Sequence, residues 1–352
     1  MPLRKLRFDT RWIALAIFFV ILDWLLITIF KPGSDWAPLW TAGRMAWDNP
    51  AQLYDFDLIA RLQGAVVDKV DFHPFIYPPS ALLLISPLAL FPFWHSLWLL
   101  AVGSIAWLAA TARRVGSDPR LVLFAPPVVI AAIVGQTSLL VIGLVALGCV
   151  ALDKDEHKAG ALFALATLIK PTLLVLAPVG LVAGRHWRAL GWSLAVGLAG
   201  VALSMLLFGI RPWFDWFEAI PAFQRMFDDY PPLVRNAVSP YALAVRLGFA
   251  SPLFVMLGAM VAAAFVWIGF SRPASAAARS ALVMGGALLL TPYAMNYELA
   301  VFAPALLALP RESLRNLLVC ALWGLSLFIT AGLLGLLVAY AAVAAPLVTK
   351  RA

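Results

Sequence analysis

The chain has 352 residues, of which 63% are hydrophobic and 12% charged, and its mean hydropathy is +0.92. Soluble domains are nearer half apolar and a quarter charged. The values therefore exclude a soluble globular domain, and also a disordered chain or a disulfide-stabilised scaffold. The net charge is +8. The basic residues lie between apolar runs, which indicates orientation in a membrane and no nucleic-acid partner.

Long apolar runs predict the membrane-spanning helices in chain order. The first run, 12–30, follows several basic residues and lacks a cleavage site of small residues, so we expect a retained signal anchor. A piece at 80–93 contains Pro87 and Pro92, which predicts a broken helix leading into the second span. The later runs of full length cover residues 94–112, 189–209, 252–270, 315–331 and 333–349.

Three further segments, 121–152, 159–183 and 280–309, are predicted to be tight helical hairpins. Their arms of about 11–15 residues are shorter than the roughly 20 that cross a bilayer, and such arms are tolerated where other helices surround them. Counting every arm predicts an all-α polytopic membrane protein with about 12 transmembrane segments, several of them short. We expect residues 1–352 to form a single domain.

The distribution of charge assigns the two sides of the membrane. The side that holds the N-terminus carries 17 basic and 6 acidic residues, whereas the opposite side carries 9 basic and 11 acidic residues. An excess of basic residues marks the cytoplasmic side. We therefore expect both termini in the cytoplasm, and we expect segments 31–79 and 210–251 to be the first and second extracytoplasmic loops.

The first outer loop begins with a turn at Gly33 and Ser34, after which Ser34 or Asp35 can cap a helix. Apolar and small residues then recur at helical spacing: Trp36, Leu39, Trp40, Gly43 and Trp47. This stripe predicts an amphipathic helix at the level of the lipid headgroups or against the bundle. Asp35 is thus expected where water meets lipid, either as a plain helix cap or as a functional carboxylate.

Asp55 and Asp57 form a D-x-D pair of the kind that can hold a divalent metal, but they follow Asn49 and Pro50, which predicts a turn and a helix start instead. The four histidines show no metal-ligand spacing. We predict no cofactor and assign no metal ligand; a divalent-metal requirement stays open.

Each predicted hairpin has its polar turn on the outer side. The turns contribute Gln136 from the first hairpin, Lys170 from the second, and Tyr293, Asn296, Tyr297 and Glu298 from the third. A charge at such depth is costly unless it has a partner or a function. We therefore predict a cavity open to the outer leaflet, lined by Asp35, Gln136, Lys170 and Glu298.

Other polar residues of the outer loops are weaker candidates. Tyr77 precedes two prolines that fix an extended entry into the next helix, and it is either an interfacial belt residue or a substrate contact. In the second outer loop, Arg225 and Arg235 are candidate anion ligands beside Asn236, although charges in such a loop are commonly solvated.

Several short motifs in order resemble glycosyltransferase family 87, whose members are polytopic enzymes of the C-type superfamily (GT-C). The motifs lie at residues 33–36, 39–44, 53–55, 77–79, 135–136, 169–171, 184–188 and 291–293, within 30–310. The resemblance implies a GT-C-type helical bundle in the bacterial plasma membrane. It also implies inverting transfer of a sugar, often mannose, from a polyprenyl-phosphate donor to a glycolipid or glycan acceptor on the extracytoplasmic face.

The resemblance also suggests roles for individual residues. Asp35 occupies the position of the family's proposed base, and Arg44 closes the motif that follows it. The third turn departs from a histidine-containing stretch found in some members, because it contains Asn296, Tyr297 and Glu298.

The hypothesis is a single displacement in which Asp35 removes the proton of the acceptor hydroxyl. Lys170, with Arg225 or Arg235, would stabilise the departing polyprenyl phosphate. The residues expected to orient or bind the sugar are Tyr77, Gln136, Arg44, Tyr293, Asn296, Tyr297, Glu298 and Asn236. The alternative is a polytopic transporter or lipid-sugar flippase, which broken helices and intramembrane charges also suit. The sequence shows no symmetry between its halves, and its polar groups gather at one face, which favours the enzyme.

Overall fold

The computed structural model describes residues 10–27, 29–67, 73–248, 252–310, 313–327 and 332–349. Within these ranges the chain is almost entirely helical, and the strand pairing is limited to an isolated bridge between Ala237 and Met295. This confirms the predicted all-α class. In the same ranges, three helices are long and apolar enough to cross a membrane, namely α5 (Phe93–Arg114), α11 (Trp187–Phe208) and α15 (Pro252–Ser271). The total number of crossings stays a prediction.

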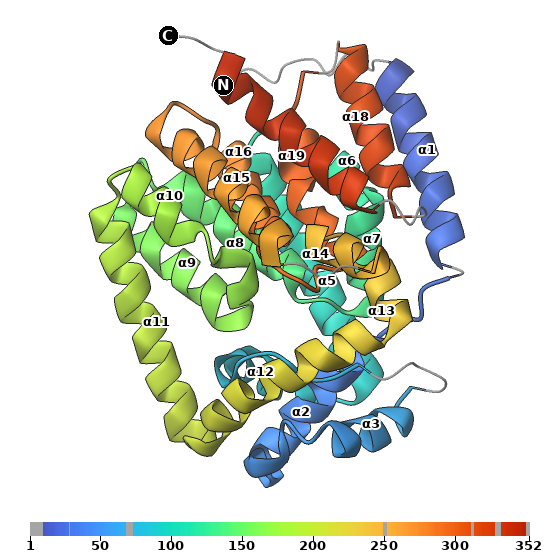
Figure 1. Cartoon of the computed structure of the whole chain (residues 1–352), viewed down its shortest axis with the longest axis vertical. Coiled ribbons are helices and arrows are strands. Elements are labelled where there is room, and N and C mark those ends of the chain that lie inside the picture. The colour runs from blue at the N-terminus through green and yellow to red at the C-terminus, as the bar shows by residue number, and fades with distance from the viewer. Residues whose placement is uncertain are drawn as a thin grey trace.

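The remaining long apolar helices complete one side of the bundle. They are α1 (Thr10–Ile27), α18 (Leu314–Leu325) and α19 (Gly332–Thr349). α1 packs against α18, and α1 begins and α19 ends at the same end of the molecule (Figure 1). Large apolar side chains stay exposed on the outer helices; Leu206 of α11, for example, is 81% exposed. An apolar surface of this kind suits contact with lipid.

The three predicted hairpins are present in the structure. The first joins α7 (Pro126–Val134) to α8 (Ser138–Ala151), after the short α6 (Pro119–Leu123). The second runs from α9 (Glu156–Ile169) through η3 (Pro171–Leu174) to α10 (Ala177–Ala183). The third runs from α16 (Ala276–Leu290) through η4 (Asn296–Phe302) to α17 (Ala303–Leu306). α8 packs against both α9 and α16 and is enclosed by protein, whereas Leu165 of α9 and Val175, directly after η3, are 46% and 52% exposed.

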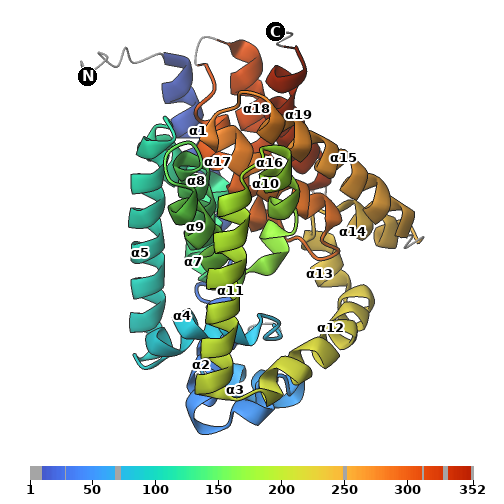
Figure 2. The same ribbon diagram turned by 90° about the vertical axis from the view of Figure 1, so that its left-hand side faces the viewer.

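The first outer segment folds into helices at the end of the molecule opposite the start of α1 (Figures 1 and 2). They are α2 (Trp36–Asp48), η1 (Pro50–Gln52) and α3 (Phe56–Gly64); η2 (Pro79–Ala81) and α4 (Leu82–Ala89) follow where the segment ends. α2 packs its predicted stripe against α4: Trp36 and Leu39 are buried, and a Cβ on Gly43 would lie 2.7 Å from the Cβ of Ala89. Trp47, at the end of the stripe, is 49% exposed.

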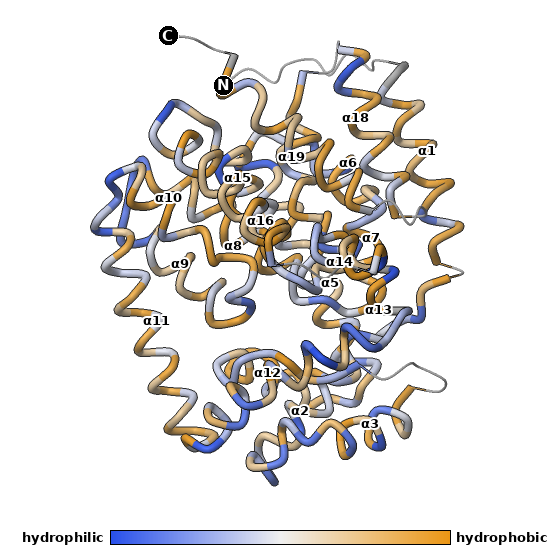
Figure 3. The backbone as a smooth tube through the Cα atoms, viewed as in Figure 1, coloured by the Kyte–Doolittle hydropathy of each residue, from blue (hydrophilic) through white to orange (hydrophobic). Residues whose placement is uncertain are grey.

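The second outer segment, expected to be a loop, is largely helical where the structure describes it. It contains α12 (Arg211–Asp229), α13 (Pro231–Asn236) and α14 (Pro240–Arg246). α12 is amphipathic and lies across the outer layer below the bundle, and Figure 3 shows its hydrophilic stretches. The indole N–H of Trp216 donates to the carbonyl oxygen of Ile76 at 3.0 Å, and Ser239 Oγ donates to the carbonyl of Pro292 at 2.6 Å. These bonds join the second outer segment to the first and to the turn of the third hairpin.

Candidate functional site

The loop that carries Asp35 is docked on the end of α7. The backbone N–H groups of Gly33 and Asp35 donate to the carbonyl oxygens of Ile133 and Val134, at 2.8 and 2.9 Å. The last carbonyls of a helix have no partner within it, so they are available to a neighbouring segment. The start of the first outer segment is therefore fixed against the turn of the first hairpin.

Gly135 ends α7 in the left-handed conformation, with φ of +82°. Many helices end with a residue in the left-handed conformation, and glycine adopts this conformation without a steric penalty because it has no Cβ atom. A Cβ at this position would also lie 2.5 Å from the Cβ of Trp36, so the absence of a side chain lets α2 approach. The turn places the next residue, Gln136, beside Asp35.

Asp35 occupies the N-cap position of α2, but its side chain makes no capping hydrogen bond. Its Oδ2 atom accepts a hydrogen bond of 2.5 Å from Nε2 of Gln136, and its Oδ1 accepts one of 3.2 Å from the hydroxyl of Ser34. The residue is 7% exposed. The carboxylate of Asp35 therefore does not act as a helix cap in the structure.

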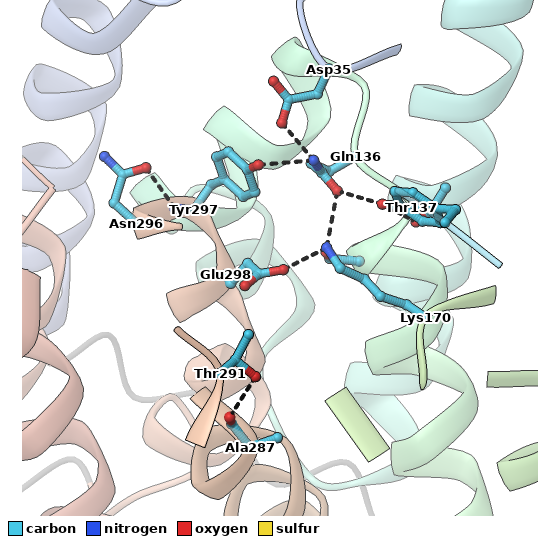
Figure 4. A network of polar contacts seen from close by, with 11 residues as sticks. Asp35, Gln136, Thr137, Lys170, Ala287, Thr291, Asn296, Tyr297 and Glu298 are labelled. Atoms are coloured by element: carbon cyan, nitrogen blue, oxygen red, sulfur yellow. Dashed lines mark hydrogen bonds and ion pairs between the residues drawn. The ribbon is translucent and has the colours of Figure 1, made fainter. Parts of the chain in front are cut away.

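Gln136 connects the groups of the site, as Figure 4 shows. Its Nε2 donates to Asp35 and, at 3.0 Å, to the hydroxyl oxygen of Tyr297. Its Oε1 accepts from the hydroxyl of Tyr77 at 3.1 Å and from Nζ of Lys170 at 3.3 Å. Both ends of the amide are thus engaged, which fixes its orientation between an anion and a cation.

Lys170 reaches the site because α9 stops directly before it. Pro171 lacks an N–H and disfavours helical backbone in the preceding residue, and Lys170 accordingly has φ of −144° and ψ of 77°. Its Nζ atom forms an ion pair of 2.5 Å with Oε1 of Glu298 and donates to Oγ of Ser138 at 3.0 Å. With the contact to Gln136, these interactions use the three protons of the ammonium group.

Two tyrosines of the first outer segment support this arrangement. The ring of Tyr77 lies under Lys170, with Nζ 5.7 Å from its centroid. The hydroxyl of Tyr54 donates to the carbonyl of Tyr77 at 2.7 Å. Burial, reinforced by the negative charge of Asp215, raises the pKa of Tyr54 well above its ordinary value. Tyr54 therefore keeps the proton that it donates.

The network faces a cavity of about 110 Å³, and a second cavity of about 320 Å³ adjoins it. Both are lined by Tyr77, Lys170 and Tyr293. The second cavity is mainly apolar and runs between η3 and α12; its further lining includes Ile76, Val175, Trp216, Ile220 and Phe223. A cation and a tyrosine hydroxyl thus lie where a cavity lined by ionisable groups meets an apolar groove.

The structure brings together most of the residues that the sequence singled out. The first cavity is lined by Asp35, Tyr77, Gln136, Lys170, Tyr293, Tyr297 and Glu298. Asn296 is buried beside them, and its Oδ1 accepts a hydrogen bond of 2.8 Å from the backbone N–H of Tyr297. Whether these residues bind a substrate stays a prediction.

Three predicted basic residues lie elsewhere. Arg44 is exposed, with its guanidinium carbon 6.0 Å from the ring centroid of Trp40. Arg225 and Arg235 are exposed as well, and neither lines the cavity of Lys170. The side chain of Asn236 lies outside the described part of the structure.

The D-x-D pair serves the local helix. Oδ1 of Asp55 accepts from the backbone N–H of Leu58 at 2.9 Å and caps α3, and Asp57 is exposed in the first turn. Among the residues that the structure describes, no group of three histidine, cysteine, aspartate or glutamate side chains is placed to hold a metal ion.

His73 lines the first cavity and was not among the predicted site residues. Its Nε2 atom lies 3.8 Å from Oδ1 of Asp35. The signal in the sequence is its position near the end of the first outer segment, four residues before Tyr77 and the proline pair. A single histidine shows no metal-ligand spacing in the sequence, so no local pattern indicates its place beside Asp35.

In a comparison with protein families, the model of glycosyltransferase family 87 matches residues 75–292, which is more than half of the chain. The matched range includes Tyr77, Gln136 and Lys170, while Asp35 and Glu298 lie outside it. Comparison with curated proteins and with solved structures gave no match.

Proposed function

Because the chain belongs to glycosyltransferase family 87, we propose that this membrane glycosyltransferase uses a polyprenyl-phosphate-sugar donor, with mannose as the first sugar to test. The acceptor in this proposal is a hydroxyl group of a glycolipid or glycan on the extracytoplasmic face. The observation that carries the proposal is the continuous set of contacts from Asp35 through Gln136 to Lys170. A carboxylate and a cation thereby face the same cavity.

The reaction is a single displacement at the anomeric carbon. The acceptor oxygen forms the new bond to this carbon while Asp35 takes the proton from the acceptor hydroxyl. The bond between the anomeric carbon and the phosphate oxygen breaks, and its electron pair leaves with the polyprenyl phosphate. One base and no covalent intermediate give inversion at that carbon.

Lys170 is the group proposed to receive the negative charge of the departing phosphate. Its three protons already have partners, so a phosphate oxygen must replace one of them. The contact with Gln136, at 3.3 Å, is longer than those with Ser138 and Glu298 and is the easiest to exchange. Glu298 then remains beside the cation and is proposed to accept hydrogen bonds from the sugar hydroxyls.

The adjoining apolar cavity supports a lipid-linked donor over a water-soluble one. Its lining by Trp216, Ile220 and Phe223 provides apolar contact for a polyprenyl chain, and it opens beside Lys170. A polyprenyl phosphate would place its charged group at the cation and its tail along the groove.

The test is covalent transfer by the purified chain in lipid vesicles, using radiolabelled polyprenyl-phosphate mannose and a membrane extract as the acceptor source. We expect label in an acceptor fraction, and at least about a 100-fold lower rate for Asp35→Asn, the range typical of a missing general base. Asp57→Asn is the matched control, because Asp57 is an exposed acid of the same outer segment. A wild-type rate in Asp35→Asn would refute the assignment of Asp35 as the base. Movement of the donor across the vesicle membrane without transfer of its sugar would favour a transporter.

A further inference from the structure

His73 lies near the end of the first outer segment and Asp35 near its start, and the two side chains face each other. His73 approaches a different carboxylate oxygen of Asp35 from the one that Gln136 binds. Gln136 binds Oδ2, whereas His73 Nε2 lies 3.8 Å from Oδ1. The His73 side chain is 28% exposed, and that of Asp35 is 9% exposed. The imidazole thus stands between a buried carboxylate and water.

The backbone of His73 is held in place by a buried side chain. Gln63 of α3 is 3% exposed, and its Nε2 donates to the carbonyl oxygen of His73 at 2.5 Å. The backbone N–H of His73 donates in turn to Oε1 of Gln63 at 3.3 Å. An amide that bonds both backbone groups of one residue holds that part of the backbone in place, so α3 keeps His73 beside Asp35.

We propose that His73 is a positioning and proton-relay residue for Asp35, an inference that rests on the proposed function. After transfer, the proton taken from the acceptor hydroxyl is on Asp35. Once the 3.8 Å separation shortens to hydrogen-bonding distance, the carboxylic acid gives this proton to Nε2 of the neutral imidazole, which regenerates the carboxylate and leaves an imidazolium. The imidazolium then releases the proton to water, and both groups return to their starting states.

The relay predicts a specific dependence on pH. It requires neutral His73, so its contribution grows as pH rises and disappears where the imidazole is protonated. The other ionisable groups facing the cavity are Tyr77, Lys170, Tyr293, Tyr297 and Glu298. Substitution of His73 leaves these groups in place, so the ratio of the wild-type rate to the variant rate at each pH isolates the contribution of His73.

The experiment compares transfer rates of the reconstituted wild type and His73→Gln from pH 5 to pH 8. The wild type is expected to be faster by about 10-fold at pH 8, a smaller effect than loss of the base itself, and by less than about 2-fold at pH 5. The difference should be in kcat and not in KM. His95→Gln is the matched control, since His95 is an exposed histidine of α5 that does not line the cavity.

A second variant separates a chemical role from a structural one. Added imidazole should raise the rate of His73→Ala at pH 8, because a small base can take the proton from Asp35, and it should leave Asp35→Asn inactive. A His73→Gln profile that runs parallel to the wild type, or no rescue by imidazole, would overturn the relay while leaving the transfer reaction intact. Absence of transfer by the wild type would overturn the proposed function, and the relay with it.

Discussion

Removal of one partner of the Lys170–Glu298 ion pair should destabilise the protein far more than removal of both. The side chains are 13% and 7% exposed, and Nζ lies 2.5 Å from Oε1. We consider Lys170→Met, Glu298→Met and the double variant, because methionine is unbranched and keeps most of the side-chain volume. Each single variant leaves a buried charge without its ionic partner.

The size of the effect follows from this geometry. At 2.5 Å, the attraction between two unit charges is about 7 kcal/mol in an effective dielectric of about 20. Desolvation of the two ions offsets most of that, so the intact pair contributes little net stability, whereas breaking one partner of such a pair costs about 3–5 kcal/mol. In Glu298→Met, Lys170 keeps its contacts with Ser138 and Gln136, which places this variant at the lower end.

The assay is the apparent Tm of the four proteins in one detergent, combined as a double-mutant cycle. A loss of 3–5 kcal/mol corresponds to a decrease on the order of 5–10 °C for a chain of this size. We expect such decreases for both single variants and a smaller one for the double variant, with a coupling of at least about 2 kcal/mol. If the losses of stability are additive and the double variant is the least stable of the four proteins, the claim that each buried charge is destabilising without its partner is refuted.

Two further substitutions test the scaffold and the groove. Gly135→Ala should destabilise the protein by about 1–2 kcal/mol because of the left-handed backbone alone, and by more because the new Cβ would contact Trp36. In the control variant Gly197→Ala, the new Cβ has no atom within 4 Å, so the apparent Tm should stay the same or rise. Equal stability of the two variants would contradict the role given to the turn. Ile220→Asn should raise KM for a long-chain polyprenyl-phosphate donor more than for a short-chain donor, measured by transfer at several donor concentrations. Phe214 is an exposed residue of α12 outside the groove, so Phe214→Asn should leave KM unchanged for both donors. If the dependence of KM on donor chain length is the same in the two variants, the groove does not bind the lipid tail.

The central features of the site could be predicted because local rules act at its turns. Pro171 ends α9 at Lys170, Gly135 ends α7 before Gln136, and the apolar arms leave each polar turn on one side. Charges confined to a few turns at one end of an apolar bundle have few possible partners. Lys170 and Glu298, 128 positions apart in the chain, therefore meet as the sequence indicated.

Other features depend on packing that a single sequence does not display. Segment 210–251 looked like a loop because its polar residues interrupt any span, yet the spacing of its aromatic residues produces α12 on the outer surface. Arg44 and Arg225 carry the right charge for an anion, but they project away from the cavity because the apolar faces of their helices pack inward. His73 is brought to Asp35 by the bonds from Gln63, a contact that no local pattern indicates.

The most direct test is the structure of Asp35→Asn with a polyprenyl-phosphate sugar bound, because this variant should bind the donor without turning it over. We expect a phosphate oxygen within hydrogen-bonding distance of Nζ of Lys170, about 2.7–3.2 Å. We also expect the anomeric carbon to face residue 35 and the lipid tail to lie along Trp216 and Ile220. A donor bound at Arg44 or Arg225, with its sugar away from residue 35, would contradict it.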